Sequence, residues 1–172
     1  MAMLDRKRYF LHDQALLGAI TASLQRSSVY KPGVSETNRA ALRKALRTSL
    51  VETVRSYTMP VSEETHVNNI SALAQRVSAE CGPCLADGHL RIGIAQKALN
   101  LYLKYLWCYG CIPTPPHCPF DSRVISRLPN QTSVCWTRLD DLDAYRSLVR
   151  AAEQVAGGQS LSIWELHAYQ RA

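Results

Sequence analysis

The stretch Gly93–Ile125, GIAQKALNLYLKYLWCYGCIPTPPHCPFDSRVI, joins an apolar segment to a loop rich in proline. Apolar residues recur at three- and four-residue steps through residues 95–107, which predicts a core-facing helix over about Ile92–Cys108. Four prolines within residues 113–119 exclude a regular element after this helix. We therefore expect a central helix, a stiff loop and a short helix near Ser122–Leu128.

The same periodicity predicts helices on both sides of this stretch. The first helix is expected over residues 4–24, the second from an N-cap at Ser35 to an end at Pro60, and the third from an N-cap at Ser62. After the short helix, a capping box of Thr137 and Asp140 opens a helix that stops at Gly157-Gly158, and a capping pattern at Ser162 and Glu165 opens the last one. No strand pattern is longer than a few residues. The sequence thus predicts an all-α fold, a single compact domain of about seven helices. Residues 1–60 would form an N-terminal helical pair, and residues 61–172 a helical core with the candidate site.

The charge of the chain favours a polyanionic partner. The 172 residues carry a net charge of +6, and many of the basic side chains lie in the first 55 residues. Such a surface suits nucleic acid, although an ordinary solvated surface explains the same charge. No segment is long and apolar enough to cross a membrane, and the N-terminal residues do not resemble a signal peptide. We therefore expect no membrane partner, a cytoplasmic location and reduced thiols.

Polar residues interrupt the apolar helix on one side. Lys97, Asn100 and Lys104 follow each other at spacings of three and four, so they share a face. One interpretation places both lysines on a solvated stripe. In the other, burial lowers the pKa of Lys97 and makes its amine a nucleophile. The proline-rich loop would then hold Asp121 nearby, where its carboxylate also caps the next helix.

Two motifs in this stretch resemble those of the helix-hairpin-helix DNA glycosylase/lyase superfamily. They are Gly93-Ile-Ala-Gln-Lys97, entering a helix, and Pro119-Phe120-Asp121, opening the next one. The segment IPTPPHCPFDSRVI is most similar to the corresponding segment of archaeal 8-oxoguanine DNA glycosylases. The resemblance covers Gly93–Ile125 and implies a helix-hairpin-helix fold, a DNA partner and a role in DNA repair.

The resemblance also implies a chemistry. The enzyme would flip a damaged nucleotide out of the duplex, and Lys97 would attack C1′ and expel the base. A Schiff base would form and permit strand cleavage, while Asp121 would assist deprotonation and stabilise the cationic sugar. The implied phosphate contacts are the backbone N–H groups near Gly93 and the side chains of Arg91, Lys104 and Arg123. Candidates for stacking on a base are Trp107, His117 and Trp136.

Six cysteines leave a metal site open as an alternative. Cys81 with Cys84 and Cys108 with Cys111 form two C-x-x-C pairs, a pattern typical of zinc. A helix of about 16 residues, about 24 Å long, would separate the pairs, so we favour ordinary thiols and expect no cofactor. Two other functions remain: a non-catalytic basic helical module that binds nucleic acid or protein, and a zinc-stabilised regulatory domain.

Overall fold

The computed structural model describes residues 3–25 and 27–170, and this part of the chain is helical, without a strand. The prediction of an all-α fold is therefore confirmed, with seven α-helices in the described part. They are α1 (Met3–Leu24), α2 (Glu36–Val54), α3 (Glu63–Cys81), α4 (Ile92–Cys108), α5 (Ser122–Ile125), α6 (Leu142–Ala156) and α7 (Leu161–Gln170). Three short 3-10 helices lie between them, η1 (Arg55–Thr58), η2 (Gly82–Cys84) and η3 (Trp136–Arg138).

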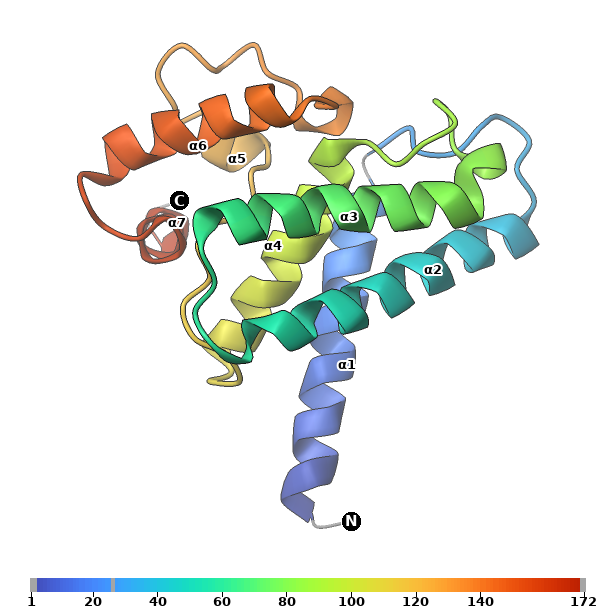
Figure 1. Cartoon of the computed structure of the whole chain (residues 1–172), viewed down its shortest axis with the longest axis horizontal. Helices are drawn as coiled ribbons and strands as arrows, with labels where there is room; N and C mark the ends of the chain where they lie inside the picture. The colour runs from blue at the N-terminus through green and yellow to red at the C-terminus, as the bar shows by residue number, and fades with distance from the viewer. Residues whose placement is uncertain (1–2, 26, 171–172) are drawn as a thin grey trace.

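Helix α4 lies at the centre of the molecule (Figure 1). Every residue from 92 to 103 is buried, because α1, α3, α6 and η3 all pack on this helix. In front of α4, α2 and α3 run antiparallel to each other, and α5, α6 and α7 lie at one end. One continuous hydrophobic core includes side chains from Ala15 in α1 to Leu161 in α7. The expected N-terminal pair therefore shares its core with the rest of the chain.

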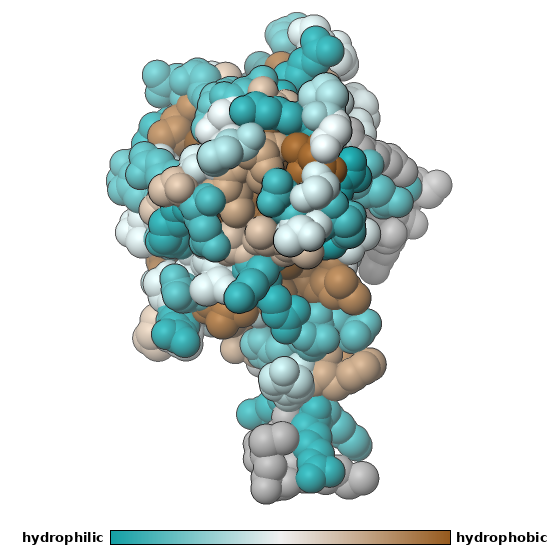
Figure 2. Space-filling model, turned by 90° about the vertical axis from the view of Figure 1, so that its right-hand side faces the viewer, coloured by the Kyte–Doolittle hydropathy of each residue, from teal (hydrophilic) through white to brown (hydrophobic). Residues whose placement is uncertain are grey.

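The first half of α1 projects from this body (Figures 1 and 2). In the space-filling view, hydrophilic and hydrophobic residues mix along the projection. Tyr9 and Phe10 are 68% and 60% exposed there, whereas Ala15, Leu16 and Ala19 further along the helix are buried. Only the second half of α1 therefore helps to build the core. None of the described helices combines the length and the apolar character needed to cross a membrane.

Two of the expected N-caps are confirmed. Ser35 Oγ accepts from the N–H of Asn38 at 3.2 Å, and Ser62 Oγ accepts from that of Thr65 at 3.1 Å. The predicted end at Pro60 is too late, since α2 ends at Val54 and η1 follows. Tyr57 leaves the helical conformation within η1, with φ −96° and ψ 15°, and its ring is buried.

Two other capping predictions are wrong. Residues around Thr137 form η3, and the cap of α6 is Asp141, whose carboxylate accepts from the N–H of Ala144 at 2.8 Å. At the start of α7, Ser162 donates its hydroxyl to the carbonyl of Pro115 at 2.9 Å. Its partner in the predicted pattern, Glu165, binds a lysine of α4. In both patterns a tertiary contact occupies the acidic residue, because Asp140 bonds to His89 and Glu165 pairs with Lys104.

Candidate functional site

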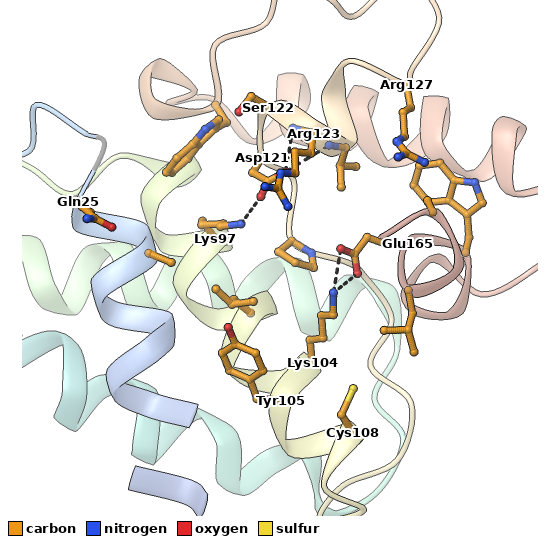
Figure 3. Close-up of a pocket in the computed structure, with 18 residues that line it drawn as sticks. Gln25, Lys97, Lys104, Tyr105, Cys108, Asp121, Ser122, Arg123, Arg127 and Glu165 are labelled. Carbon is orange, nitrogen blue, oxygen red and sulfur yellow. Dashed lines mark hydrogen bonds and ion pairs between the residues drawn. The ribbon is translucent and has the colours of Figure 1, made fainter. Parts of the chain in front are cut away.

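Lys97 and Asp121 form an ion pair between α4 and the start of α5. Lys97 Nζ lies 2.6 Å from Asp121 Oδ2, and the two side chains are 7% and 26% exposed (Figure 3). The other carboxylate oxygen, Oδ1, accepts from the N–H groups of Arg123 and Val124 at 3.0 and 3.2 Å. Asp121 is therefore both the N-cap of α5 and the partner of Lys97, so the two roles considered from the sequence coexist.

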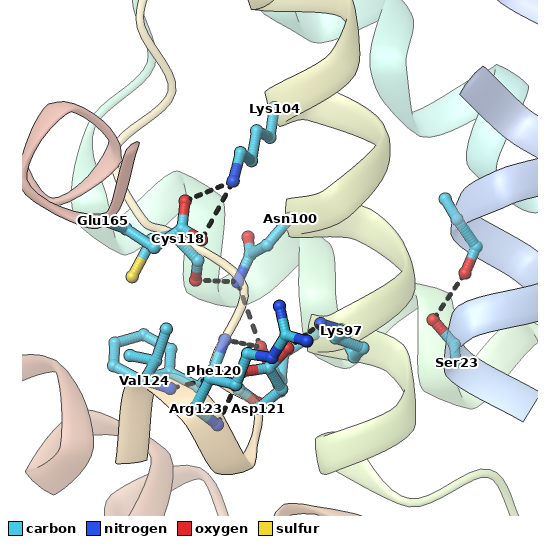
Figure 4. Close-up of polar contacts among 12 residues, drawn as sticks. Ser23, Lys97, Asn100, Lys104, Cys118, Phe120, Asp121, Arg123, Val124 and Glu165 are labelled. Carbon is cyan, nitrogen blue, oxygen red and sulfur yellow. Dashed lines mark hydrogen bonds and ion pairs between the residues drawn. The ribbon is translucent and has the colours of Figure 1, made fainter. Parts of the chain in front are cut away.

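Polar side chains of α4 hold the loop that delivers Asp121 (Figure 4). The Gln96 carboxamide donates to the carbonyl of Phe120 at 2.7 Å and accepts from its N–H at 3.2 Å. Asn100 donates to the carbonyl of Cys118 at 3.0 Å. Gln96 and Asn100 are fully buried, so water does not compete for these bonds. The rigidity of the loop therefore comes from α4 as well as from its prolines.

Asp121 is ionised at neutral pH. Burial acts to raise the pKa of its carboxyl group, but the charge of Lys97 and the hydrogen bonds to the carboxylate outweigh this effect. The pKa of Asp121 consequently lies below its ordinary value. The site thus presents a fixed negative charge beside a lysine amine.

The ion pair lies on the wall of a cavity of about 430 Å³. Cationic side chains line this cavity together with aromatic rings (Figure 3). The cations besides Lys97 are Lys104, Arg123 and Arg127, and the aromatic residues are Tyr105, Trp136 and Trp164. A volume of this size holds a small organic ligand. The carboxylates of Asp121 and Glu165 also line the cavity, so its wall combines aromatic rings with an excess of cations over carboxylates.

A second lysine of α4, which is half-buried, pairs with α7. Lys104 Nζ lies 2.6 Å from Glu165 Oε2 and 2.9 Å from Oε1, and the side chains are 13% and 9% exposed. With Lys97 equally enclosed, the interpretation of a solvated lysine stripe is wrong. The partner of Lys104 lies 61 residues away in sequence, and no local pattern indicated it. This pair links α7 to α4 (Figure 4).

Only some of the expected phosphate contacts lie at the cavity. Arg123 and Lys104 line the cavity, but Arg91 does not. The guanidinium of Arg91 donates to the carbonyl of Thr137 at 2.9 Å and pairs with Asp87. The expected anion site at Gly93 is wrong, because its N–H donates to the carbonyl of Leu139 at 2.7 Å.

Gly93 has a packing role instead. A Cβ at this position would clash with the carbonyl oxygen of Trp136 and lie 3.1 Å from Cβ of Leu139. Helix α4 can thus approach η3 closely only because residue 93 lacks a side chain. The glycine of the Gly-x-x-x-Lys motif is therefore explained by helix packing in this structure.

The three candidates for base stacking differ in position. Trp136 lines the cavity although it is 6% exposed, and Trp107 is absent from the lining. His117 is 2% exposed, its Nδ1 bonds to the Tyr145 hydroxyl at 2.7 Å, and its ring meets that of His66 edge-on. Stacking on His117 is therefore wrong for this structure, since no face of the ring is accessible. Trp164, which the sequence analysis did not select, lines the cavity.

The cysteines occupy different environments. Cys81 and Cys84 are buried, Cys111 is half-buried, and Cys108 is exposed at the edge of the cavity. Within the described residues, no group of three or more Cys, His, Asp or Glu side chains is arranged to hold a metal ion. No family model, curated protein or solved structure matches the chain, so the chemistry of the site rests on the residues described above.

Proposed function

We propose that this protein binds DNA and acts as a base-excision glycosylase/lyase, with Lys97 as nucleophile and Asp121 as its acidic partner. One observation carries the proposal: an enclosed lysine, paired with a carboxylate, lies on the wall of a cavity lined by cations and aromatic rings. The sequence resemblance of Gly93–Ile125 supports the same chemistry, because its two motifs contain Lys97 and Asp121.

The cavity has the features that a flipped nucleotide requires. An extruded base stacks between aromatic and apolar side chains, and its phosphates need cations nearby. Trp136, Trp164 and Tyr105 supply rings, and Arg123 and Arg127 supply positive charge near α5. Because the ion pair is part of the same wall, a base held among the rings places its sugar near Lys97.

The proposed reaction begins when Lys97 passes a proton to Asp121, which transfers it to the departing base. Its amine forms a bond to C1′ of the sugar, the bond between C1′ and the base breaks, and the base leaves with the electron pair and gains a proton. The anionic Asp121 stabilises the positive charge that develops on the sugar. Loss of the second amine proton and opening of the sugar ring give a Schiff base. Removal of a C2′ proton then breaks the C3′–O bond, and the phosphate-terminated strand departs.

Borohydride trapping tests this proposal. Wild-type protein, incubated with an abasic-site duplex and reductant, is expected to form a covalent complex that resists denaturing electrophoresis. Lys97→Arg keeps the positive charge beside Asp121 but removes the nucleophile, so its complex should be absent. Lys104→Arg is the matched control, because it alters the other enclosed lysine of the same helix, and it should still be trapped.

Two outcomes would overturn the proposal. The first is the absence of a trapped species from wild-type protein with abasic DNA and with duplexes carrying oxidised or deaminated bases. The second is equal trapping by wild type and Lys97→Arg. Salt-dependent DNA affinity without trapping would instead favour a non-catalytic nucleic-acid-binding module.

A further inference from the structure

A second hollow lies between the C-terminal half of α1 and the basic face of α2. This α1–α2 groove has a volume of about 670 Å³. Leu17, Ile20 and Leu24 of α1 form its apolar floor, and Tyr30 follows from the loop after α1. Four cationic residues of α2 complete the lining, Arg39, Arg43, Lys44 and Arg47.

The lining of this groove carries four cations and no acidic residue. Two of the cations pair with carboxylates outside the lining, Arg43 with Glu36, and Arg47 with Asp13 at 2.5 Å. The guanidinium of Arg39 lies 5.0 Å from the centre of the Tyr30 ring, which leaves its charge in place. With Lys44, the groove therefore keeps a net positive charge beside an apolar surface, where electrostatic attraction is stronger than in open water.

The groove and the cavity meet at one residue. Gln25, just after the end of α1, belongs to the lining of both hollows. In Figure 3 it lies on the α1 side of the Lys97–Asp121 pair. A chain-like ligand held at Lys97 can therefore continue past Gln25 into the α1–α2 groove.

We propose that the α1–α2 groove binds the phosphate backbone of the DNA strand that flanks the flipped nucleotide; this inference rests on the proposed function. Arg39 and Arg47 are eight residues apart, or about 12 Å along α2. Because successive phosphates of one strand are farther apart along the backbone than the axial rise of about 3.4 Å, this row is long enough to contact more than one of them. A phosphate backbone is the ligand whose repeated charge matches a row of cations leading out of the cavity.

The test is the salt dependence of DNA binding. Arg39→Ala/Lys44→Ala removes the two cations of the groove that form no ion pair with a carboxylate of the described residues. The probe is a fluorescent duplex with a central tetrahydrofuran, a stable abasic-site analogue, and anisotropy gives its affinity at several salt concentrations. The slope of log affinity against log salt should become shallower by about 0.9 per lost phosphate contact. Arg55→Ala/Arg150→Ala changes two exposed arginines that line neither hollow, and its slope should equal that of wild type.

The outcomes separate this inference from the proposed function. Equal slopes for wild type and Arg39→Ala/Lys44→Ala would overturn the groove as a DNA site, even if trapping succeeds. Absence of trapping by wild-type protein, together with a shallower slope for Arg39→Ala/Lys44→Ala, would overturn the lyase and support the groove. Selective loss of binding to phosphatidylserine vesicles, with DNA binding intact, would assign the groove to a membrane surface and overturn the inference.

Discussion

Lys97 Nζ lies 2.6 Å from one carboxylate oxygen of Asp121, while the other oxygen accepts two backbone hydrogen bonds at the start of α5. The charge of Asp121 and its capping role thus act through different atoms. An asparagine at this position retains an oxygen for the cap but removes the negative charge. Substitution can therefore separate the ion pair from the cap.

We expect Asp121→Asn to destabilise the protein by roughly 1–3 kcal/mol, because it leaves a lysine enclosed without its carboxylate. Urea unfolding measures this change. The matched control is Asp141→Asn, since Asp141 caps α6 through Ala144 and forms no ion pair within the described residues. That variant should change stability by no more than about 0.5 kcal/mol, as Asn and Asp cap equally well. Equal losses for both variants would show that the charge of Asp121 contributes nothing to stability.

The same Asp121→Asn variant should slow the proposed reaction. Removing a group that assists proton transfer costs typically about 10²–10⁴-fold in rate. Single-turnover cleavage of abasic DNA at saturating protein measures this step apart from binding. A variant that binds the tetrahydrofuran duplex normally but cleaves at the wild-type rate would exclude a chemical role for Asp121.

Sequence periodicity was sufficient for the helices but not for their tertiary partners. Helix α4 was predicted at its observed boundaries, because its apolar spacing and the prolines after it are local signals. Glu165 and Gln25 were not found as site residues, since each joins the site from a segment remote in sequence. Gln96 was missed for a different reason: its two bonds to Phe120 depend on where the loop returns, which spacing along α4 does not show.

Glycine and histidine illustrate the same limit at single positions. Gly93 matched a motif by spacing, yet its structural role is contact with η3. His117 was a candidate for stacking, but its side chain is buried, and the rings of His66 and Tyr145 pack against its imidazole. A sequence pattern selects residues of the right type for a site, but the packing of the folded chain decides which of these residues a ligand can reach.

Two buried histidines should make the protein unstable in mild acid. Burial lowers the pKa of His66 to about 4, and burial together with the nearby His66 places the pKa of His117 well below its ordinary value. Both are neutral in the folded protein, whereas the unfolded chain binds protons below a pKa of about 6.5. Stability is therefore complete above pH 6.5 and falls as the pH drops toward 4, by about 3 kcal/mol for His66 alone.

Urea unfolding between pH 7 and pH 4 tests this pH dependence. His89→Gln is the contrasting control. In the wild-type protein the hydrogen bond to Asp140 raises the pKa of His89, so His89 stabilises the folded state in acid. Removing it should leave the acid instability intact or slightly steeper. The Asp121–Lys97 pair adds a separate loss below about pH 4, since the pKa of Asp121 is lowered and its stabilisation ends as the carboxylate is protonated. A flat stability profile between pH 6.5 and 4 would contradict the assignment of neutral buried histidines.

Lys104 and Glu165 should be replaceable together but not singly. Glu165→Gln leaves Lys104 without this carboxylate in an enclosed place and should cost roughly 3 kcal/mol, with α7 as the helix most affected. Lys104→Met/Glu165→Met removes both charges, and its stability should return to within about 1 kcal/mol of wild type. A double-mutant cycle by urea unfolding gives the coupling between the two residues. Additive losses in the cycle would mean that the pair contributes no coupling.

Gly93 and Gly18 provide a matched test of the packing that positions Lys97. Both are helical glycines, and alanine in a helix is favoured over glycine by about 1 kcal/mol where there is room. At Gly18 a new Cβ would lie 3.3 Å from the ring of Tyr105, a side chain that can shift, so Gly18→Ala should change stability by less than about 1 kcal/mol.

At Gly93 the obstacle is the backbone carbonyl of Trp136, and α4 must separate from η3. Gly93→Ala should therefore cost about 3 kcal/mol or more and shift the Trp136 fluorescence, because the two segments part where the cavity begins. Equal stability of the two variants would show that α4 does not depend on this close contact to hold its place.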